Sequence, residues 1–283
     1  RETLKDRGIV LETVVPPVPQ LARDWLTSQE LDAAVLPSPV LLDHVARGTP
    51  LGASMNLLTH DPINVIVRRS VADKRGLNEN QPLRDRLLGL KGLKLGVARH
   101  PPPRLRALFE SQGLNVDDVV ETVHVGGKKQ NRAFAKGEVD VLFAHTPYLE
   151  RALLEQEAVL LVRLSRGDVP ELSSRVIHTF TFLPEMQRER PAVAKAIADE
   201  VTQWLGKLRT NPSSAVDVLA RAFPARERKE LELIVELYHR AVPETPALNR
   251  QGLERSLSFY PEGYARPNVS VDALDRIAAL RVD

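Results

Sequence analysis

Two short motifs in this chain, Ser38-Pro39 and Thr146-Pro147, place a hydroxyl residue and a proline where an apolar run gives way to an amphipathic stretch. Serine and threonine are favoured as helix N-caps and proline in the first helical turn, so each motif predicts the start of a helix. Helix N-termini carry unsatisfied N–H groups and a partial positive charge, which favour anions. The two motifs together indicate a site for a small anionic ligand, although capping alone also accounts for both hydroxyl groups.

Basic residues and glycines follow two further apolar runs, at 93–98 and 119–125, which are typical of strands. Open α/β sheets bind ligands at the carboxyl ends of their strands, so these loops are expected to strengthen the anion site. The alternative is that the charged side chains are simply solvated. The candidates in the two loops are Arg99, His100, Arg104 and Gly127.

Four more residues complete the predicted site. His145 stands just before the second motif, and Tyr148 follows its proline, where the ring would face the ligand. His60 and Asp61 interrupt another apolar run and suggest an acid–base pair, but adjacent residues of a strand point to opposite faces, so we expect no catalytic residue there. The predicted ligand-binding residues are Ser38, Pro39, His60, Asp61, Arg99, His100, Arg104, Gly127, His145, Thr146 and Tyr148.

The elements that carry these motifs occur twice. Residues 30–45 align without a gap with residues 138–153, and the start of the chain resembles residues 106–114, with a strand expected next at 9–15. Each copy is typical of a buried strand followed by a helix, so two related α/β units with the ligand between them are expected. Because a strand and a loop precede the second copy, we expect one more strand and loop before Arg1.

Strands that alternate with helical patterns predict parallel βαβ units in each half of the chain. Two apolar runs, at 63–69 and 176–182, bracket the second unit and are expected to form the hinges. The sequence therefore predicts that lobe 1 comprises 1–67 and 183–283 and that lobe 2 comprises 68–182, including the hinge strands.

The last hundred residues change character. Apolar residues recur there at helical spacing, with breaks at Pro212 and Pro224. We expect a helical layer packed on lobe 1, with Trp204 and Tyr238 as core residues of that layer rather than as ligand contacts.

Composition excludes several classes of function. The 283 residues have a net charge of +2, which gives no field that would attract nucleic acid, and no cysteine, which excludes thiolate nucleophiles and disulfides. No apolar run approaches the roughly 18 to 20 residues of a membrane span. The seven histidines never lie four residues apart, and neither a nucleophile elbow nor a dinucleotide fingerprint occurs, so we predict no metal and no cofactor.

The order of four segments carries a family resemblance. The chain resembles the substrate-binding proteins of ABC importers, in the branch that handles aliphatic sulfonates, taurine, nitrate and thiamine-precursor pyrimidines. The segments are NVIVRRS at 64–70, LKGLKLGVA at 90–98, VAKAIADEVTQWL at 193–205 and NPSSAVDVLA at 211–220. This chain departs from the family in the stiff, basic loop RHPPPR at 99–104, where relatives have a Gly/Ser-rich turn.

The resemblance implies an α/β, two-lobed periplasmic-binding-protein-like fold of type II that closes about a hinge. It implies a monomer that captures a small-molecule ligand in the interlobe cleft, in the periplasm or anchored outside the cytoplasm, and delivers it to an ABC transporter permease. The basic loops favour a sulfonate, a carboxylate or a similar oxyanion, and Tyr148 keeps an aromatic acid open.

Two alternatives use the same scaffold. One is an enzyme of the decarboxylase or desulfinase type, and the absence of cysteine and of metal and cofactor motifs disfavours it. The other is the effector domain of a transcription regulator, which the long helical tail after residue 183 and the absence of a helix-turn-helix pattern disfavour.

Overall fold

The computed structural model describes residues 2–98, 103–258 and 266–282. The chain divides into two compact units. Unit 1 consists of Arg1–Thr59, Ser174–Thr210 and Val242–Asp283, and unit 2 consists of His60–Ser173 and Asn211–Ala241.

Within the described residues, unit 1 is built on a three-stranded antiparallel sheet. Its strands are β1 (Ala33–Pro37), β8 (His178–Phe182) and β2 (Ser54–Leu58), with β8 in the middle. The helices of unit 1 are α1 (Glu2–Lys5), α2 (Pro19–Thr27), α3 (Ser38–Ala46), α10 (Pro184–Glu189), α11 (Pro191–Thr210), α14 (Arg250–Leu257) and α15 (Val271–Ala279).

The core of unit 1 forms because apolar side chains of the sheet meet the apolar faces of these helices. Leu36 and Phe182 from the sheet and Leu41, Ala194 and Leu253 from α3, α11 and α14 are all buried in one cluster. This burial holds together three stretches of chain that are far apart in the sequence.

Unit 2 is built, in its described part, on a five-stranded mixed sheet of order β5-β4-β6-β3-β7. Strands β4, β5 and β6 are parallel, whereas β3 runs antiparallel to both β6 and β7. The strands are β3 (Ile63–Arg68), β4 (Lys94–Val97), β5 (Glu121–His124), β6 (Val141–His145) and β7 (Ala158–Arg163).

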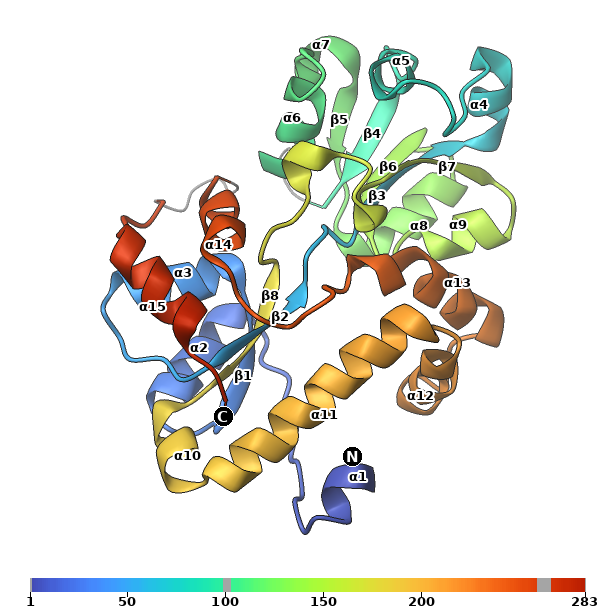
Figure 1. The fold of residues 1–283 in the computed structure, drawn as a ribbon. Helices are drawn as coiled ribbons and strands as arrows, with labels where there is room; N and C mark the ends of the chain where they lie inside the picture. Colours follow the sequence, from blue (N-terminus) through green and yellow to red (C-terminus); the bar gives the residue numbers. More distant parts are fainter. Residues whose placement is uncertain (1, 99–102, 259–265, 283) are drawn as a thin grey trace. The chain divides into compact units, whose positions relative to one another are not determined.

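Helices lie on both faces of this sheet (Figure 1). The α-helices are α4 (Arg69–Arg75), α5 (Leu83–Leu88), α6 (Pro103–Glu110), α7 (Val116–Val119), α8 (Gly127–Ala135), α9 (Glu150–Leu154), α12 (Ser214–Ala222) and α13 (Arg228–Tyr238). The 3-10 helices are η1 (Leu164–Arg166), η2 (Pro170–Leu172) and η3 (His239–Ala241). The connection from β4 to β5 contains α6, and the connection from β5 back to β6 contains α8. These connections run in opposite directions across the sheet, so right-handed crossovers put α6 and α8 on opposite faces. Buried Phe134, Leu142 and Leu237 join α8, β6 and α13 in one core cluster.

The predicted repeat is visible in the topology. The order β1-β8-β2 in unit 1 corresponds to β6-β3-β7 in unit 2, with antiparallel pairs in both. The two predicted crossover strands, β3 and β8, thus hold equivalent central places.

The strand predicted at 9–15 is wrong, because these residues form no regular structure. Its counterpart β5 is held by hydrogen bonds to β4. The described part of unit 1 contains no strand in the position of β4, so residues 9–15 have no neighbour with which to pair.

The compact units differ from the predicted lobes in two respects. The chain passes between them near residues 60 and 174, before the crossover strands rather than after them. The C-terminal helices also divide: α12 and α13 belong to unit 2, not to a single layer on the first lobe. The physical reason is that α13 buries Leu237 in the core of unit 2 and packs against α9.

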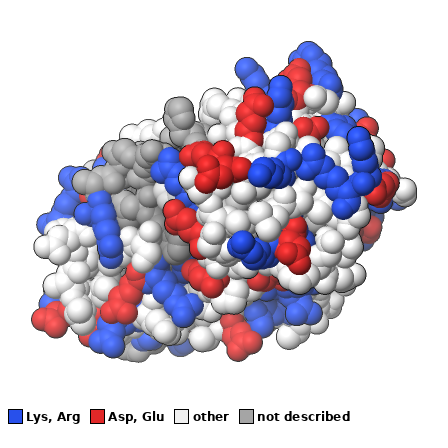
Figure 2. All heavy atoms as spheres, turned by 90° about the horizontal axis from the view of Figure 1, so that it is seen from above, with Lys and Arg blue, Asp and Glu red and all other residues white. Residues whose placement is uncertain are grey.

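The surface is mixed in charge. Figure 2 shows Lys and Arg side chains interspersed with Asp and Glu over the face seen from above. Among the described helices, none combines the length and the hydrophobicity needed to cross a lipid bilayer.

Candidate functional site

The predicted residues of unit 2 lie along one edge of its sheet. Parallel strands β4, β5 and β6 all end at this edge, and antiparallel β3 begins there, with Ile63 paired to His145. Loops that are distant in sequence therefore meet, as expected for the ligand-binding edge of an open α/β sheet. Arg99 and His100, which follow β4, lie outside the described residues.

An ion pair joins two of the predicted residues. Arg104, in the first turn of α6, donates from Nη1 to Oδ1 of Asp61 at 2.6 Å. The Asp61 side chain is 0% exposed and that of Arg104 36% exposed. Burial lowers the pKa of Arg104, but an arginine stays charged at neutral pH. The sequence predicted that Arg104 and Asp61 would each contact the ligand, whereas in the structure Nη1 of Arg104 donates to Asp61.

His60 and Asp61 contact different neighbours. The His60 ring lies against Gly167, where a Cβ atom would be only 2.9 Å from the ring. Gly167 has a left-handed φ of 86°, so both the backbone and the space favour glycine. Asp61, by contrast, accepts from Arg104.

The loop after β6 brings three predicted residues together. The Tyr148 ring packs on Gly127, the first residue of α8, where an added Cβ would lie 2.8 Å from the ring. His145 is exposed, and its ring centroid is 5.4 Å from that of Tyr148. The rings of Tyr148 and His145 therefore lie next to the N-terminus of α8, a helix of nine residues, at this edge of the sheet.

Thr146 does not begin a helix, so that prediction is wrong. Helix α9 begins at Glu150, with Leu149 in the N-cap position. The N–H of Thr146 donates to the Tyr238 hydroxyl at 2.8 Å, so this backbone group already has a partner within the protein.

Ser38 lies in unit 1, at the start of a helix as predicted, but it is not the N-cap residue. It is the first residue of α3, and Pro37 rather than Ser38 holds the N-cap position. Ser38 is buried, and its N–H donates to the carbonyl of Ile177 at 3.0 Å. Pro39 is in the first turn, as the sequence predicted.

The sequence did not identify a buried polar cluster behind the loop. Glu150 is 0% exposed, and its Oε2 accepts from the N–H of Leu149 at 3.3 Å, while Oε1 has no hydrogen-bond partner. Burial is the main cause that raises the pKa of Glu150. Burial and the nearby Glu150 also raise the pKa of Tyr238. Both groups lie behind the loop, and the Tyr238 hydroxyl supports it by accepting from the N–H of Thr146.

The described residues hold no group of three or more His, Asp or Glu side chains suited to a metal ion. At this edge the structure places the Tyr148 ring, the exposed His145, the N-terminus of α8 and the Arg104 guanidinium, one nitrogen of which already donates to Asp61. These groups can orient a small ligand that carries a planar or anionic part.

Solved structures share this fold. The alkanesulfonate-binding protein SsuA from Xanthomonas axonopodis pv. citri, bound to MOPS, is 17% identical with a TM-score of 0.59, over 91% of this chain and 83% of that one. The periplasmic aliphatic sulphonate-binding protein SsuA from Escherichia coli is 15% identical with a TM-score of 0.62, over 89% and 79%. The periplasmic nitrate-binding protein NrtA from Synechocystis PCC 6803 is 12% identical with a TM-score of 0.58, over 98% and 82%.

The fold is therefore that of the periplasmic binding proteins, as the sequence predicted. A model of the NMT1-like family matches residues 1–220, and the chain belongs to that family. No match was found among curated proteins.

Proposed function

We propose that this protein is the solute-binding component of an ABC import system and that it works outside the cytoplasm as a monomer. It captures a small ligand that bears a sulfonate, a carboxylate or a similar oxyanion and delivers it to a membrane permease. The observation that carries the proposal is the shared fold with sulfonate-binding and nitrate-binding proteins over most of the chain.

The edge of unit 2 supports an anionic ligand. His145 is exposed at the end of β6, and Gly127 opens α8 with its N–H groups at the same edge. The Tyr148 ring packed on Gly127 offers a face to the apolar part of a ligand. We propose that Arg104 contributes its remaining N–H groups, since an arginine has five and one of them serves Asp61.

A thermal-shift screen tests the proposal. The panel comprises alkanesulfonates, MOPS, nitrate, aromatic carboxylates and aminopyrimidines. A specific ligand at a hundred times its dissociation constant stabilises the folded state by about 2.7 kcal/mol. At roughly 2 to 4 °C per kcal/mol for a chain of this size, the melting temperature should rise by several degrees.

Replacing Tyr148 with alanine should abolish the shift, whereas replacing the exposed Leu154 with alanine, a control in the neighbouring α9, should leave it unchanged. A panel in which no anion shifts the melting temperature would contradict the proposal. Turnover of a bound compound would instead identify an enzyme on this scaffold.

A further inference from the structure

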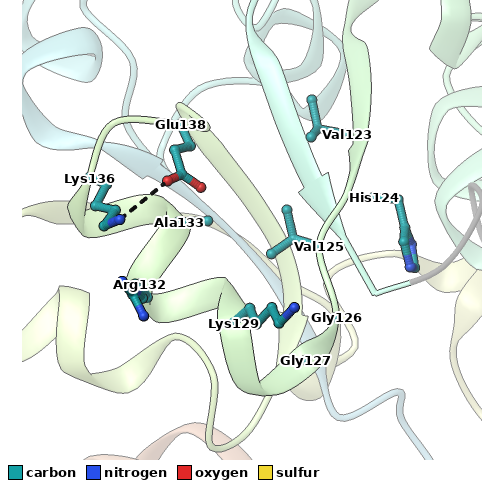
Figure 3. A pocket seen from close by; sticks show the side chains of 10 residues that line it. All are labelled: Val123, His124, Val125, Gly126, Gly127, Lys129, Arg132, Ala133, Lys136 and Glu138. Atoms are coloured by element: carbon teal, nitrogen blue, oxygen red, sulfur yellow. Dashed lines mark ion pairs between the residues drawn. The ribbon is translucent and has the colours of Figure 1, made fainter.

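A groove on unit 2 lies beside the end of the sheet at which β4, β5 and β6 finish. A hollow of about 760 Å³ runs between β5 and α8 (Figure 3). Its floor is apolar, and basic side chains of α8 form one wall. The floor residues are Val123, Val125 and Ala133, and the basic residues are Lys129, Arg132 and Lys136.

The hollow exists because α8 does not cover the whole sheet. This helix packs on β4 and β6, which leaves the helix-side face of β5 beside it only half-buried. Val123 and Val125 lie on that face and line the hollow.

Strand β5 is at the end of the sheet, and β4 is its sole strand partner in the described part of the chain. The N–H of Glu121 bonds to Leu93 at 2.9 Å, and the N–H of Val125 bonds to Val97 at 2.8 Å. Alternate residues of a strand direct their N–H and C=O groups to opposite sides, so the backbone groups of Thr122 point away from β4. This is the geometry at which an additional strand can pair.

The charged residues that line the hollow are three basic ones and one acidic one, Glu138. Lys129 and Arg132 belong to α8, and Lys136 is its C-cap residue. Their spacing of three and four residues puts them on one side of the helix, where all three are exposed. Lys136 is 3.8 Å from Glu138. For the other two, no acidic partner is present among the residues that the structure describes.

We propose that this groove binds an extended, acidic segment of a partner protein, which adds to β5 as an edge strand and points its acidic side chains at α8. The dimensions agree. Lys129 and Lys136 are separated by about 10.5 Å along a helix axis, at 1.5 Å per residue. Side chains on one face of a strand repeat roughly every 6.6 Å, so two or three acidic residues at alternate positions span the basic wall.

Charge complementarity excludes a second copy of this chain as the occupant. Pairing of β5 with β5 of another molecule would bring two basic walls to the same face of the joined sheet. Like charges repel at such distances, whereas an acidic segment is attracted. The inference concerns the flank of unit 2, and it does not depend on the identity of the transported ligand.

A synthetic peptide of four Thr-Glu repeats, blocked at both ends, is the probe. The full chain is titrated with the labelled peptide by fluorescence anisotropy, and the backbone amide of Thr122 is followed by NMR hydrogen exchange. We expect saturable binding and roughly tenfold or greater slowing of Thr122 exchange at saturation. A Thr-Lys peptide should not bind.

Charge reversal of Lys129, Arg132 and Lys136 together should weaken binding about tenfold or more, since each exposed pair is worth up to a few-fold in affinity. If the charge-reversed protein does not fold, the same three residues are replaced with methionine, which removes the charges and preserves the aliphatic part of the side chains. The control is Lys91→Glu, at a residue in the turn before β4 that does not line the hollow.

Three results would overturn the inference. They are absence of peptide binding, binding that survives both sets of substitutions, and binding that leaves Thr122 exchange unchanged. The last result would also be produced by a helical acidic partner, which the same assay with a helix-forming Glu-rich peptide would identify.

Discussion

Replacing the buried Glu150 with glutamine should stabilise this protein at neutral pH. Glutamine keeps the shape of the side chain and a hydrogen-bonding end, but it carries no ionisable proton. Burial raises the pKa of Glu150 in the folded state above its value of 4.5 in the unfolded chain. The folded state therefore binds this proton more tightly than the unfolded state does, and the sign of the pH dependence follows.

The stabilisation that Glu150 contributes in its protonated form is fully present below pH 4.5 and is lost as the pH rises through the raised pKa. Each unit by which the pKa is raised corresponds to about 1.4 kcal/mol at pH values above it. Each kcal/mol corresponds to roughly 2 to 4 °C in melting temperature for a chain of this size. The glutamine variant does not experience this loss.

The assay is a set of thermal melts of the parent and of Glu150→Gln between pH 4 and pH 9. The difference in melting temperature should be near zero at the acidic end and should grow in favour of glutamine as the pH rises. Glu155→Gln is the matched control, because Glu155 is exposed near the end of the same helix and is expected to change stability by about 0.5 kcal/mol or less. A difference that does not depend on pH, or one that favours the parent at neutral pH, would refute the reasoning.

Three further substitutions test the site. Tyr238→Phe removes the hydroxyl that accepts from the N–H of Thr146 and should cost about 1 to 3 kcal/mol in urea unfolding. Gly127→Ala places a Cβ 2.8 Å from the Tyr148 ring and should displace that ring, with a cost of roughly 1 to 3 kcal/mol and a loss of ligand-induced thermal shift. Asp61→Asn removes the buried counter-charge of its arginine partner and should cost about 1 to 3 kcal/mol, reduced from a fully buried pair by the partial exposure of the arginine.

Each substitution has an outcome that would contradict it. A Tyr238→Phe protein as stable as the parent would mean that water replaces the hydroxyl at no cost. Unchanged ligand binding by Gly127→Ala would remove Tyr148 from the site. An Asp61→Asn protein that is more stable than its parent would mean that desolvation of the two charges outweighs their attraction.

Much of the fold could be predicted because apolar runs mark the buried strands. The runs that contain β1, β4, β6 and β8 are continuous or alternating, and each is followed or preceded by a helical pattern. The repeat then related the two units. Strand β7, at Ala158–Arg163, was not predicted, although its sequence AVLLVR is apolar, because β7 and its counterpart β2 both lie beyond the two aligned segments.

Less of the site could be predicted, because its contacts join residues that are remote in sequence. Arg104 and Asp61 are 43 residues apart, and Tyr238 is 92 residues from Thr146. Local pattern named His145 and Tyr148 as site residues but gave no signal for the partners that other elements supply. The helix expected at Thr146 begins instead at Glu150, and the N–H of Thr146 bonds to a tyrosine from α13 that the local pattern did not indicate.

Calorimetric titration with a matched pair of compounds tests the central claim most directly. The pair is the anion that gives the largest thermal shift and its uncharged counterpart, such as an alkanesulfonate and the methyl sulfone of the same length. The account predicts saturable binding of the anion with one site per chain and binding of the neutral compound that is weaker by about tenfold or more, as expected for hydrogen bonds to a charged group. Equal affinity for the two compounds, or saturable binding by neither, would contradict it.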